Sequence, residues 1–336
     1  MKARDEQGLL SEDEALQWLD EQLATAGIER TGDMEVTRER PWGTVRSAPT
    51  SRGRVWMKAP GPQTAFEVPL YELLQRVGPE HVLEPIAVDV ERGWILLPDG
   101  GPALADRLTG KPLADEMARV LAQYGGMQRD LAPHADELLS LGVADMRPAA
   151  MPGRFGEAIE AVSGYVERVG SASERAAFER VAAVEEAFGS WCERLAALPG
   201  PPSLDHNDLH PWNILVSDPG TGAQARFYDW GDSVLAHPFA CMLVPLGYVQ
   251  SKLGCHLDGP ALLRVRDAYL EVFADLGQPG ELVEALELAC HVGKVARALV
   301  WHRALTAEGP ADTGEFAGAP LETLATLLDE SYLGGA

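Results

Sequence analysis

The chain has 336 residues, of which 46% are hydrophobic and 24% charged, so it can bury a sizeable core and is long enough for two domains or one bilobal unit. Its formal net charge of −23 makes nucleic acid a poor partner, because phosphate groups would be repelled. Most of the acidic excess lies after residue 100, which suits either a cationic small-molecule substrate or a solvated surface.

Membrane insertion and disulfide chemistry are not expected. No stretch approaches the roughly 18 to 20 unbroken apolar residues of a membrane helix, and the N-terminus lacks the apolar core of a signal peptide. We therefore expect a cytoplasmic protein with no membrane partner. The four cysteines are widely spaced and form no C-x-x-C pair, which predicts reduced thiols rather than a zinc site.

The first hundred residues predict a small antiparallel sheet with helices beside it. Apolar residues on one face predict a helix near Glu12–Ala26, and a second helix is expected near Thr64–Arg76. Short β-type runs bounded by turn residues predict the strands. The expected strands are Met34–Arg40, Thr44–Ala48, Val55–Lys58, Val82–Val90 and Gly93–Leu97.

After the Pro98-Asp99-Gly100-Gly101 turn, helical patterns dominate. The segment between Pro201 and Pro238 instead alternates strands, turns and loops. The fold class is therefore α+β, with a sheet-rich lobe at residues 1–98 and a helical lobe at residues 99–336. Beyond the turn, helices are expected at Leu113–Leu131, Phe155–Val169, Ser173–Leu198 and from Ala261 to the end, and strands at Ser203–His206, Ile214–Val216 and Ala225–Tyr228.

The strongest motif lies in the strand-rich segment, which reads HNDLHPWNIL at 206–215 and FYDWGD at 227–232. Two neighbouring strands would bring Asn213 and Asp229 together, and their amide and carboxylate oxygens suit Mg²⁺. Asp208, in a tight proline-containing loop, can accept a proton from a hydroxyl. Phosphoryl transfer needs such parts, because charge must be neutralised and the attacking hydroxyl aligned.

This spacing is similar to the H-R-D-x-x-x-x-N loop and D-F-G site of protein kinases. It resembles more closely the aminoglycoside phosphotransferase family, which includes choline-kinase-like enzymes and has the patterns H-x-D-x-x-x-x-N and I-D-W-x-D. The resemblance implies a bilobal protein-kinase-like fold, ATP or GTP, Mg²⁺ and a small hydroxylated acceptor. It implies Asp208 as catalytic base and Asn213 and Asp229 as metal ligands.

The resemblance continues upstream and covers roughly residues 35–240. It implies that Lys58 holds the nucleotide phosphates, paired with Glu67 or with Glu72 further along the same helix. Leu97 lies in the expected hinge, where backbone groups would bind adenine. Thr44 ends a loop that contains one glycine in place of a glycine-rich loop, and it is expected to help cover the phosphates.

Some residues near the motif keep more than one interpretation. Asp232 is a candidate substrate residue, either for a cationic acceptor or for a second metal through water, and a structural cap is the alternative. His206 and His210 are expected to be structural. Asn207 stands where protein kinases have the arginine of H-R-D, which disfavours a protein substrate. The basic helix at residues 291–302 either lines the acceptor site or presents a solvated face.

The sequence therefore predicts an ATP-dependent phosphotransferase acting on a hydroxyl of a small molecule. We expect an antibiotic-modifying resistance enzyme, with a choline, homoserine or sugar kinase as the close alternative. An inactive nucleotide-binding regulatory protein is disfavoured, because the residues that catalysis needs are all present. A metal-dependent hydrolase is disfavoured by Asn213 and by the missing third ligand.

Overall fold

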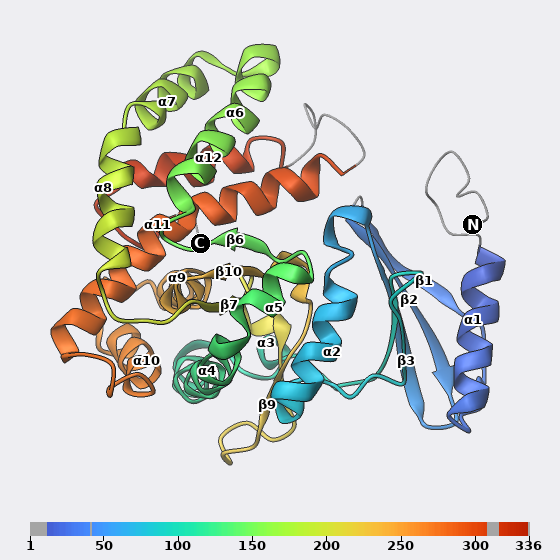
Figure 1. Cartoon of the computed structure of the whole chain (residues 1–336). Coiled ribbons are helices and arrows are strands. Elements are labelled where there is room, and N and C mark those ends of the chain that lie inside the picture. The colour runs from blue at the N-terminus through green and yellow to red at the C-terminus, as the bar shows by residue number, and fades with distance from the viewer. Residues whose placement is uncertain (1–11, 41, 308–315, 335–336) are drawn as a thin grey trace.

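The computed structural model describes residues 12–40, 42–307 and 316–334. Its N-terminal part is an antiparallel sheet with the strand order β1-β2-β3-β5-β4 (Figure 1). The strands are β1 (Glu35–Arg40), β2 (Gly43–Thr50), β3 (Gly53–Pro60), β4 (Ala87–Asp89) and β5 (Trp94–Pro98).

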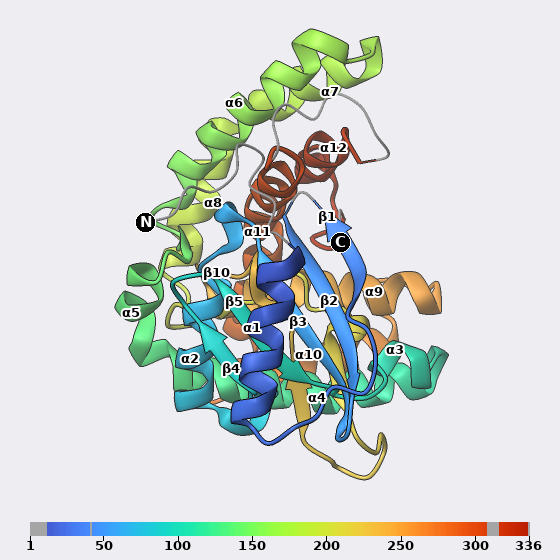
Figure 2. The same cartoon turned by 90° about the vertical axis from the view of Figure 1, so that its right-hand side faces the viewer.

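Two helices cover opposite faces of this sheet. Helix α1 (Glu12–Thr25) lies across the outer face, and α2 (Glu67–Val77) lies between the sheet and the helical part (Figures 1 and 2). Trp18 of α1 packs with Met57 and Leu96 of the sheet in a small hydrophobic core. The buried side chains of α2 belong instead to the larger core of the helical part, so this helix joins the two lobes.

The helical part is built around α4 and α11, which pack against several shorter helices. Two small sheets, β6-β10-β7 and β8-β9, lie beside them. The helices are α3 (Leu104–Arg107), α4 (Gly110–Leu131), α5 (Ala135–Ser140), α6 (Met151–Val169), α7 (Ala172–Ala182), α8 (Glu185–Ala196), α9 (Leu243–Leu253), α10 (Pro260–Glu271), α11 (Pro279–Leu305) and α12 (Ala319–Ala325). The strands are β6 (Ala144–Met146), β7 (Ser203–Asp205), β8 (Ile214–Val216), β9 (Ala225–Phe227) and β10 (Val234–Ala236).

Short 3₁₀ helices connect these elements. They are η1 (Pro62–Thr64), η2 (Pro79–His81), η3 (Ala132–His134), η4 (Pro211–Asn213), η5 (Trp230–Asp232), η6 (Pro238–Met242) and η7 (Thr326–Leu328). Two of them, η4 and η5, carry the predicted motif residues. The predicted α+β fold class, with a sheet-rich N-terminal lobe and a helical C-terminal lobe, is confirmed. The division at residue 98 stays a prediction.

Two predicted elements differ from the structure. The single helix predicted at Ser173–Leu198 is wrong: α7 and α8 are separate, because α7 packs against α12 whereas α8 packs against α11. No glycine or proline marks that break. The strand predicted at Val82–Val90 shortens to β4. Strands β6 and β10 and helix α9 lie outside the predicted elements, and the two strands are three residues each.

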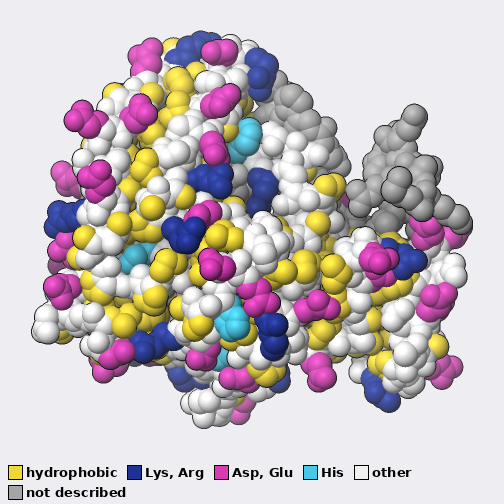
Figure 3. All heavy atoms as spheres, in the orientation of Figure 1, with side chains coloured by type: hydrophobic (Ala, Val, Ile, Leu, Met, Phe, Trp, Pro, Cys, Tyr) yellow, Lys and Arg dark blue, Asp and Glu magenta, His cyan; other side chains and the backbone are white. Residues whose placement is uncertain are grey.

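None of the helices within the described ranges combines the length and hydropathy needed to cross a bilayer. All four cysteines are free thiols, and Cys192, Cys241 and Cys290 are buried. Acidic side chains are scattered over the face shown in Figure 3, with basic side chains between them. The large negative charge is therefore not gathered into one patch on this face.

Candidate active site

The loop after β7 is held rigidly by buried polar contacts. Asn207 has a left-handed backbone with φ of 63°, and its N–H donates to Asp205 Oδ1 at 2.7 Å. His206 is fully buried, and its Nε2 donates to the carbonyl of Tyr228 at 2.9 Å. Its backbone N–H donates to the hydroxyl of Tyr124 at 3.0 Å. Burial raises the pKa of Asp205 to about 7 and lowers the pKa of His206.

Asp208 follows in this loop, and both of its oxygens have a partner. Arg297 Nη2, from α11, lies 2.9 Å from Oδ1, and His210 Nε2 lies 3.3 Å from Oδ2. Burial alone would raise the pKa of Asp208, but the charge of Arg297 and the hydrogen bond from His210 hold it well below its usual range. The carboxylate is therefore ionised at neutral pH and can accept a hydrogen bond from a hydroxyl.

Asn213 and Asp229 come together across the β8-β9 hairpin. The two strands are antiparallel, and the N–H of Tyr228 donates to the carbonyl of Asn213 at 3.3 Å. The Nδ2 of Asn213 donates to the carbonyl of Asp208 at 2.9 Å, so Oδ1 is the side-chain atom that could face a metal ion. Asp229 has φ of 65°, and its side chain is 40% exposed. An amide oxygen and an accessible carboxylate fit a hard cation such as Mg²⁺.

Lys58 of β3 links this hairpin to α2. Its Nζ lies 2.6 Å from Glu67 Oε1 and 2.5 Å from Asp229 Oδ1. Burial alone would lower the pKa of Lys58, but the charges of Asp229 and Glu67 outweigh it and raise the pKa. The same Lys58 charge lowers the pKa of Asp229. Glu72 is exposed, so the structure pairs Lys58 with Glu67.

Glu67 is fixed by a second contact. Its Oε1 also accepts the backbone N–H of Trp230 at 3.0 Å, at the start of η5. Glu67 as a whole residue is 2% exposed, and this burial raises the pKa of its carboxyl group. A Cβ at Gly231 would lie 3.3 Å from Glu67 Oε2, so a glycine there lets η5 approach the carboxylate. These contacts make Glu67 the anchor of both Lys58 and the metal-site turn.

Asp232 has a guanidinium partner on α11. Arg303 Nη2 lies 3.5 Å from Asp232 Oδ1 and donates to the carbonyl of Gly231 at 2.7 Å. Burial and the nearby negative charge of Asp208 raise the pKa of Asp232 to about 6. The carboxyl group therefore titrates closer to neutral pH than an ordinary aspartate, and it already has a guanidinium partner.

The other predicted nucleotide residues lie on the sheet. Thr44 of β2 pairs with Ala59 of β3, directly after the β1-β2 turn. Pro41 of that turn lies outside the described residues. Leu97 of β5 pairs with Trp56 and is followed by Gly100, where a Cβ would approach Leu215 Cδ1 to 2.2 Å. The predicted hinge therefore runs tightly against β8 of the helical lobe.

Arg297 belongs to the basic helix predicted either to line the acceptor site or to be solvated, whereas Arg303 was not singled out from the sequence. The available signal was the basic face of the helix at residues 291–302. The side chain of Arg297 is only 12% exposed and points to Asp208, so this residue does not belong to a solvated face. Lys294 is fully buried, and its Nζ donates to the carbonyls of Thr326 and Ser331 at 2.9 and 2.8 Å. It holds the C-terminal segment onto α11.

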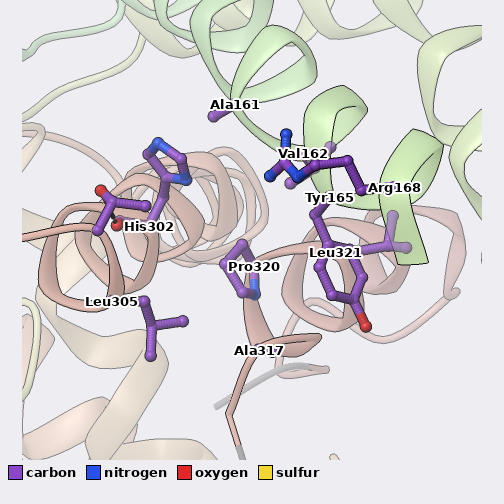
Figure 4. Close-up of a pocket in the computed structure, with 10 residues that line it drawn as sticks. Ala161, Val162, Tyr165, Arg168, His302, Leu305, Ala317, Pro320 and Leu321 are labelled. Atoms are coloured by element: carbon purple, nitrogen blue, oxygen red, sulfur yellow. Dashed lines mark hydrogen bonds between the residues drawn. The ribbon is translucent and has the colours of Figure 1, made fainter. Parts of the chain in front are cut away.

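A small cavity between α6, α11 and α12 is not part of this site. Figure 4 shows it lined by side chains that include Tyr165, His302 and Leu321. Its volume is about 30 Å³, which is room for one or two water molecules. This volume is too small for an acceptor. None of the motif residues lines the cavity, so it also lies away from the candidate active site.

Comparison with solved structures identifies similar folds at low identity. A macrolide 2'-phosphotransferase from Brachybacterium faecium aligns with a TM-score of 0.55 and 18% identity, covering 94% of this chain and 98% of that one. An ethanolamine kinase from Plasmodium vivax aligns with a TM-score of 0.63 and 12% identity, covering 90% and 83%. A spectinomycin phosphotransferase solved with ADP and spectinomycin has a TM-score of 0.52 and 14% identity, covering 95% and 96%.

No curated protein sequence matches the chain significantly. A family model described as the phosphotransferase enzyme family matches residues 48–243, which is more than half of the chain. The matched region runs from β2 through the loop of Asp208 and the turn of Asp229 to η6. The chain therefore belongs to the phosphotransferase enzyme family.

Proposed function

We propose that the protein transfers the γ-phosphoryl group of ATP or GTP to a hydroxyl of a small molecule. The observation that carries this proposal is the arrangement of contacts and strand pairing that brings together four residues from distant parts of the chain. Lys58 contacts Asp229, the β8-β9 hairpin places Asp229 beside Asn213, and Asn213 contacts Asp208. Together they offer an ammonium group that can bind phosphate, two candidate metal ligands and a candidate base.

Each residue has a defined part in the transfer. Lys58, held by Glu67, donates to the nucleotide phosphates. Asn213 Oδ1 and Asp229 would hold Mg²⁺, which would neutralise charge on the phosphates. Asp208 accepts a hydrogen bond from the acceptor hydroxyl and takes its proton as the new P–O bond forms and the bond to the leaving diphosphate breaks.

We place the nucleotide between the N-terminal sheet and the helical lobe. The backbone of the hinge after Leu97 binds the purine, and Thr44 and the β1-β2 turn cover the phosphates. The structural similarity to a spectinomycin phosphotransferase solved with ADP supports nucleotide use by this fold.

For the acceptor, we propose a hydroxylated antibiotic, so that the enzyme would confer resistance. The macrolide and spectinomycin phosphotransferases have the same fold as this chain and similar length. A metabolite kinase is the second candidate, because the ethanolamine kinase aligns with the higher TM-score of 0.63.

A screen for ATP consumption against hydroxylated antibiotics and common metabolites tests the function. We expect Asp208→Asn to lower kcat by about 10²- to 10⁴-fold and to leave the affinity for a non-hydrolysable ATP analogue within about threefold. Asp275→Asn, at an exposed pair with Arg129, is the matched control and should keep full activity. Undiminished turnover by Asp208→Asn would exclude this residue as the base.

A further inference from the structure

The groups that contact Asp208 define the side from which an acceptor arrives. His210 reaches one carboxylate oxygen from within the catalytic loop, and Arg297 reaches the other from α11. A hydroxyl that donates to Asp208 must therefore lie within reach of both side chains. The surface that extends from His210 and Arg297 is the acceptor surface.

Trp212 dominates this surface on the side of the loop. It is 45% exposed, more than any other of the eight tryptophans, all of which lie in described parts of the chain. Its ring meets His210 edge-to-face at 5.8 Å and Tyr248 of α9 edge-to-face at 5.6 Å between centroids. Its carbonyl accepts the hydroxyl of Tyr228 at 2.5 Å. An indole so firmly held and yet open to solvent, next to the base, is typical of a binding surface.

The charges around the same surface are balanced. The carboxylate of Asp208 is paired with Arg297 at 2.9 Å, and that of Asp232 is paired with Arg303 at 3.5 Å. The guanidinium of Arg297 also lies 5.6 Å from the centre of the Trp301 ring. Each of these carboxylates is already neutralised by a guanidinium group, so the two pairs offer no unpaired negative charge to a molecule with several positive charges. The net charge of −23 is therefore not reflected in these two paired carboxylates.

We propose that the acceptor is a hydroxylated molecule with an apolar ring face and at most one positive charge, bound against Trp212 beside Asp208. Trp212 and Tyr248 supply apolar contact, while Arg297 and Arg303 neutralise the carboxylates that would otherwise attract a polycation. This inference rests on the proposed phosphotransfer function, which places the acceptor next to Asp208. It disfavours highly charged aminoglycosides as acceptors.

Equilibrium binding tests the inference without requiring turnover. The full chain is titrated calorimetrically with erythromycin, a macrolide with one amine, and with streptomycin, which carries two guanidinium groups. Both titrations contain Mg²⁺ and a non-hydrolysable ATP analogue. We expect erythromycin to bind at least about tenfold more tightly than streptomycin.

Variants of the exposed indole complete the test. Trp212→Ala should weaken erythromycin binding about tenfold, and Trp212→Phe should restore most of it. Leu276→Ala removes an apolar side chain that is 36% exposed outside this surface and should change nothing. The analogue should bind all variants equally, which shows that they are folded.

Three results would overturn the inference: tighter or equal binding of streptomycin, binding of neither probe, or erythromycin affinity that Trp212→Ala leaves unchanged. Failure of the proposed function is recognised separately, by undiminished turnover of Asp208→Asn.

Discussion

At the scale of single residues, Lys58 connects the two lobes through two carboxylates of different character. Glu67 is buried, whereas the side chain of Asp229 is 40% exposed and can turn to a metal ion. Lys58 is the cation that contacts Glu67 directly, so removal of Lys58 leaves a buried carboxylate with the N–H of Trp230 as its remaining hydrogen-bond donor among the described contacts. Such a group becomes protonated or destabilises the fold.

We therefore predict that Lys58→Met raises the KM for ATP at least about tenfold and lowers stability by about 2 kcal/mol, or roughly 3 °C in Tm. The double variant Lys58→Met/Glu67→Gln should recover the Tm but not the ATP affinity, because the buried charge is gone while the phosphate ligand stays missing. Thermal unfolding and ATP titrations measure the two effects. A Lys58→Met protein that is as stable as the parent would contradict this account of Glu67.

At the scale of elements, α4 and α10 approach closely through a glycine. A Cβ at Gly125 would lie 3.1 Å from Phe273 Cε2 and 3.2 Å from Tyr269 Cε2. The Tyr269 ring has little freedom to move, since its hydroxyl donates to Gln128 Oε1 at 2.6 Å. The neighbouring Gly126 has no atom within 4 Å of a built Cβ. The two glycines therefore differ in packing within the same helix.

This difference predicts substitutions of opposite sign. Gly125→Ala should destabilise the protein by about 1–3 kcal/mol through overpacking. Gly126→Ala should stabilise it by about 0.5–1 kcal/mol, because alanine favours the helix and nothing obstructs its methyl group. Denaturant or thermal unfolding of the pair checks the prediction. If both variants changed the free energy of unfolding by the same amount, the close approach of α10 to Gly125 would not contribute to stability.

At the scale of the whole molecule, the net charge of −23 opposes compaction through self-repulsion, and on the face shown in Figure 3 the acidic side chains are scattered. Salt screens this repulsion, because the Debye length falls from about 10 Å at 0.1 M to about 3 Å at 1 M. The acceptor surface is locally balanced, so the charge affects global stability more than acceptor choice.

We predict that raising NaCl from 50 to 300 mM increases the Tm by several degrees. Choline chloride at the same ionic strength should give the same increase, because screening does not depend on the identity of the cation. Differential scanning fluorimetry measures both. A Tm that falls or stays constant with added salt would show that repulsion is not significant.

The sequence by itself determined the α+β class and located the two motif segments, to which we assign the catalytic and metal-binding roles. The motif residues 206–213 and 227–232 are close along the chain, and a hairpin with three-residue strands suffices to bring them together. Strand and helix periodicity also located most elements of the sheet and the long helices. These features depend on local geometry and spacing, which a sequence displays directly.

Only the tertiary structure decided the long-range partners. Lys58 meets Asp229 across 171 residues, and Glu67 rather than Glu72 faces it because α2 turns that residue inward. The partnership of Arg297 with Asp208 depends on how α11 packs against the loop. The break between α7 and α8 likewise follows from their different neighbours. Packing of distant segments sets all of these, and no local pattern records it.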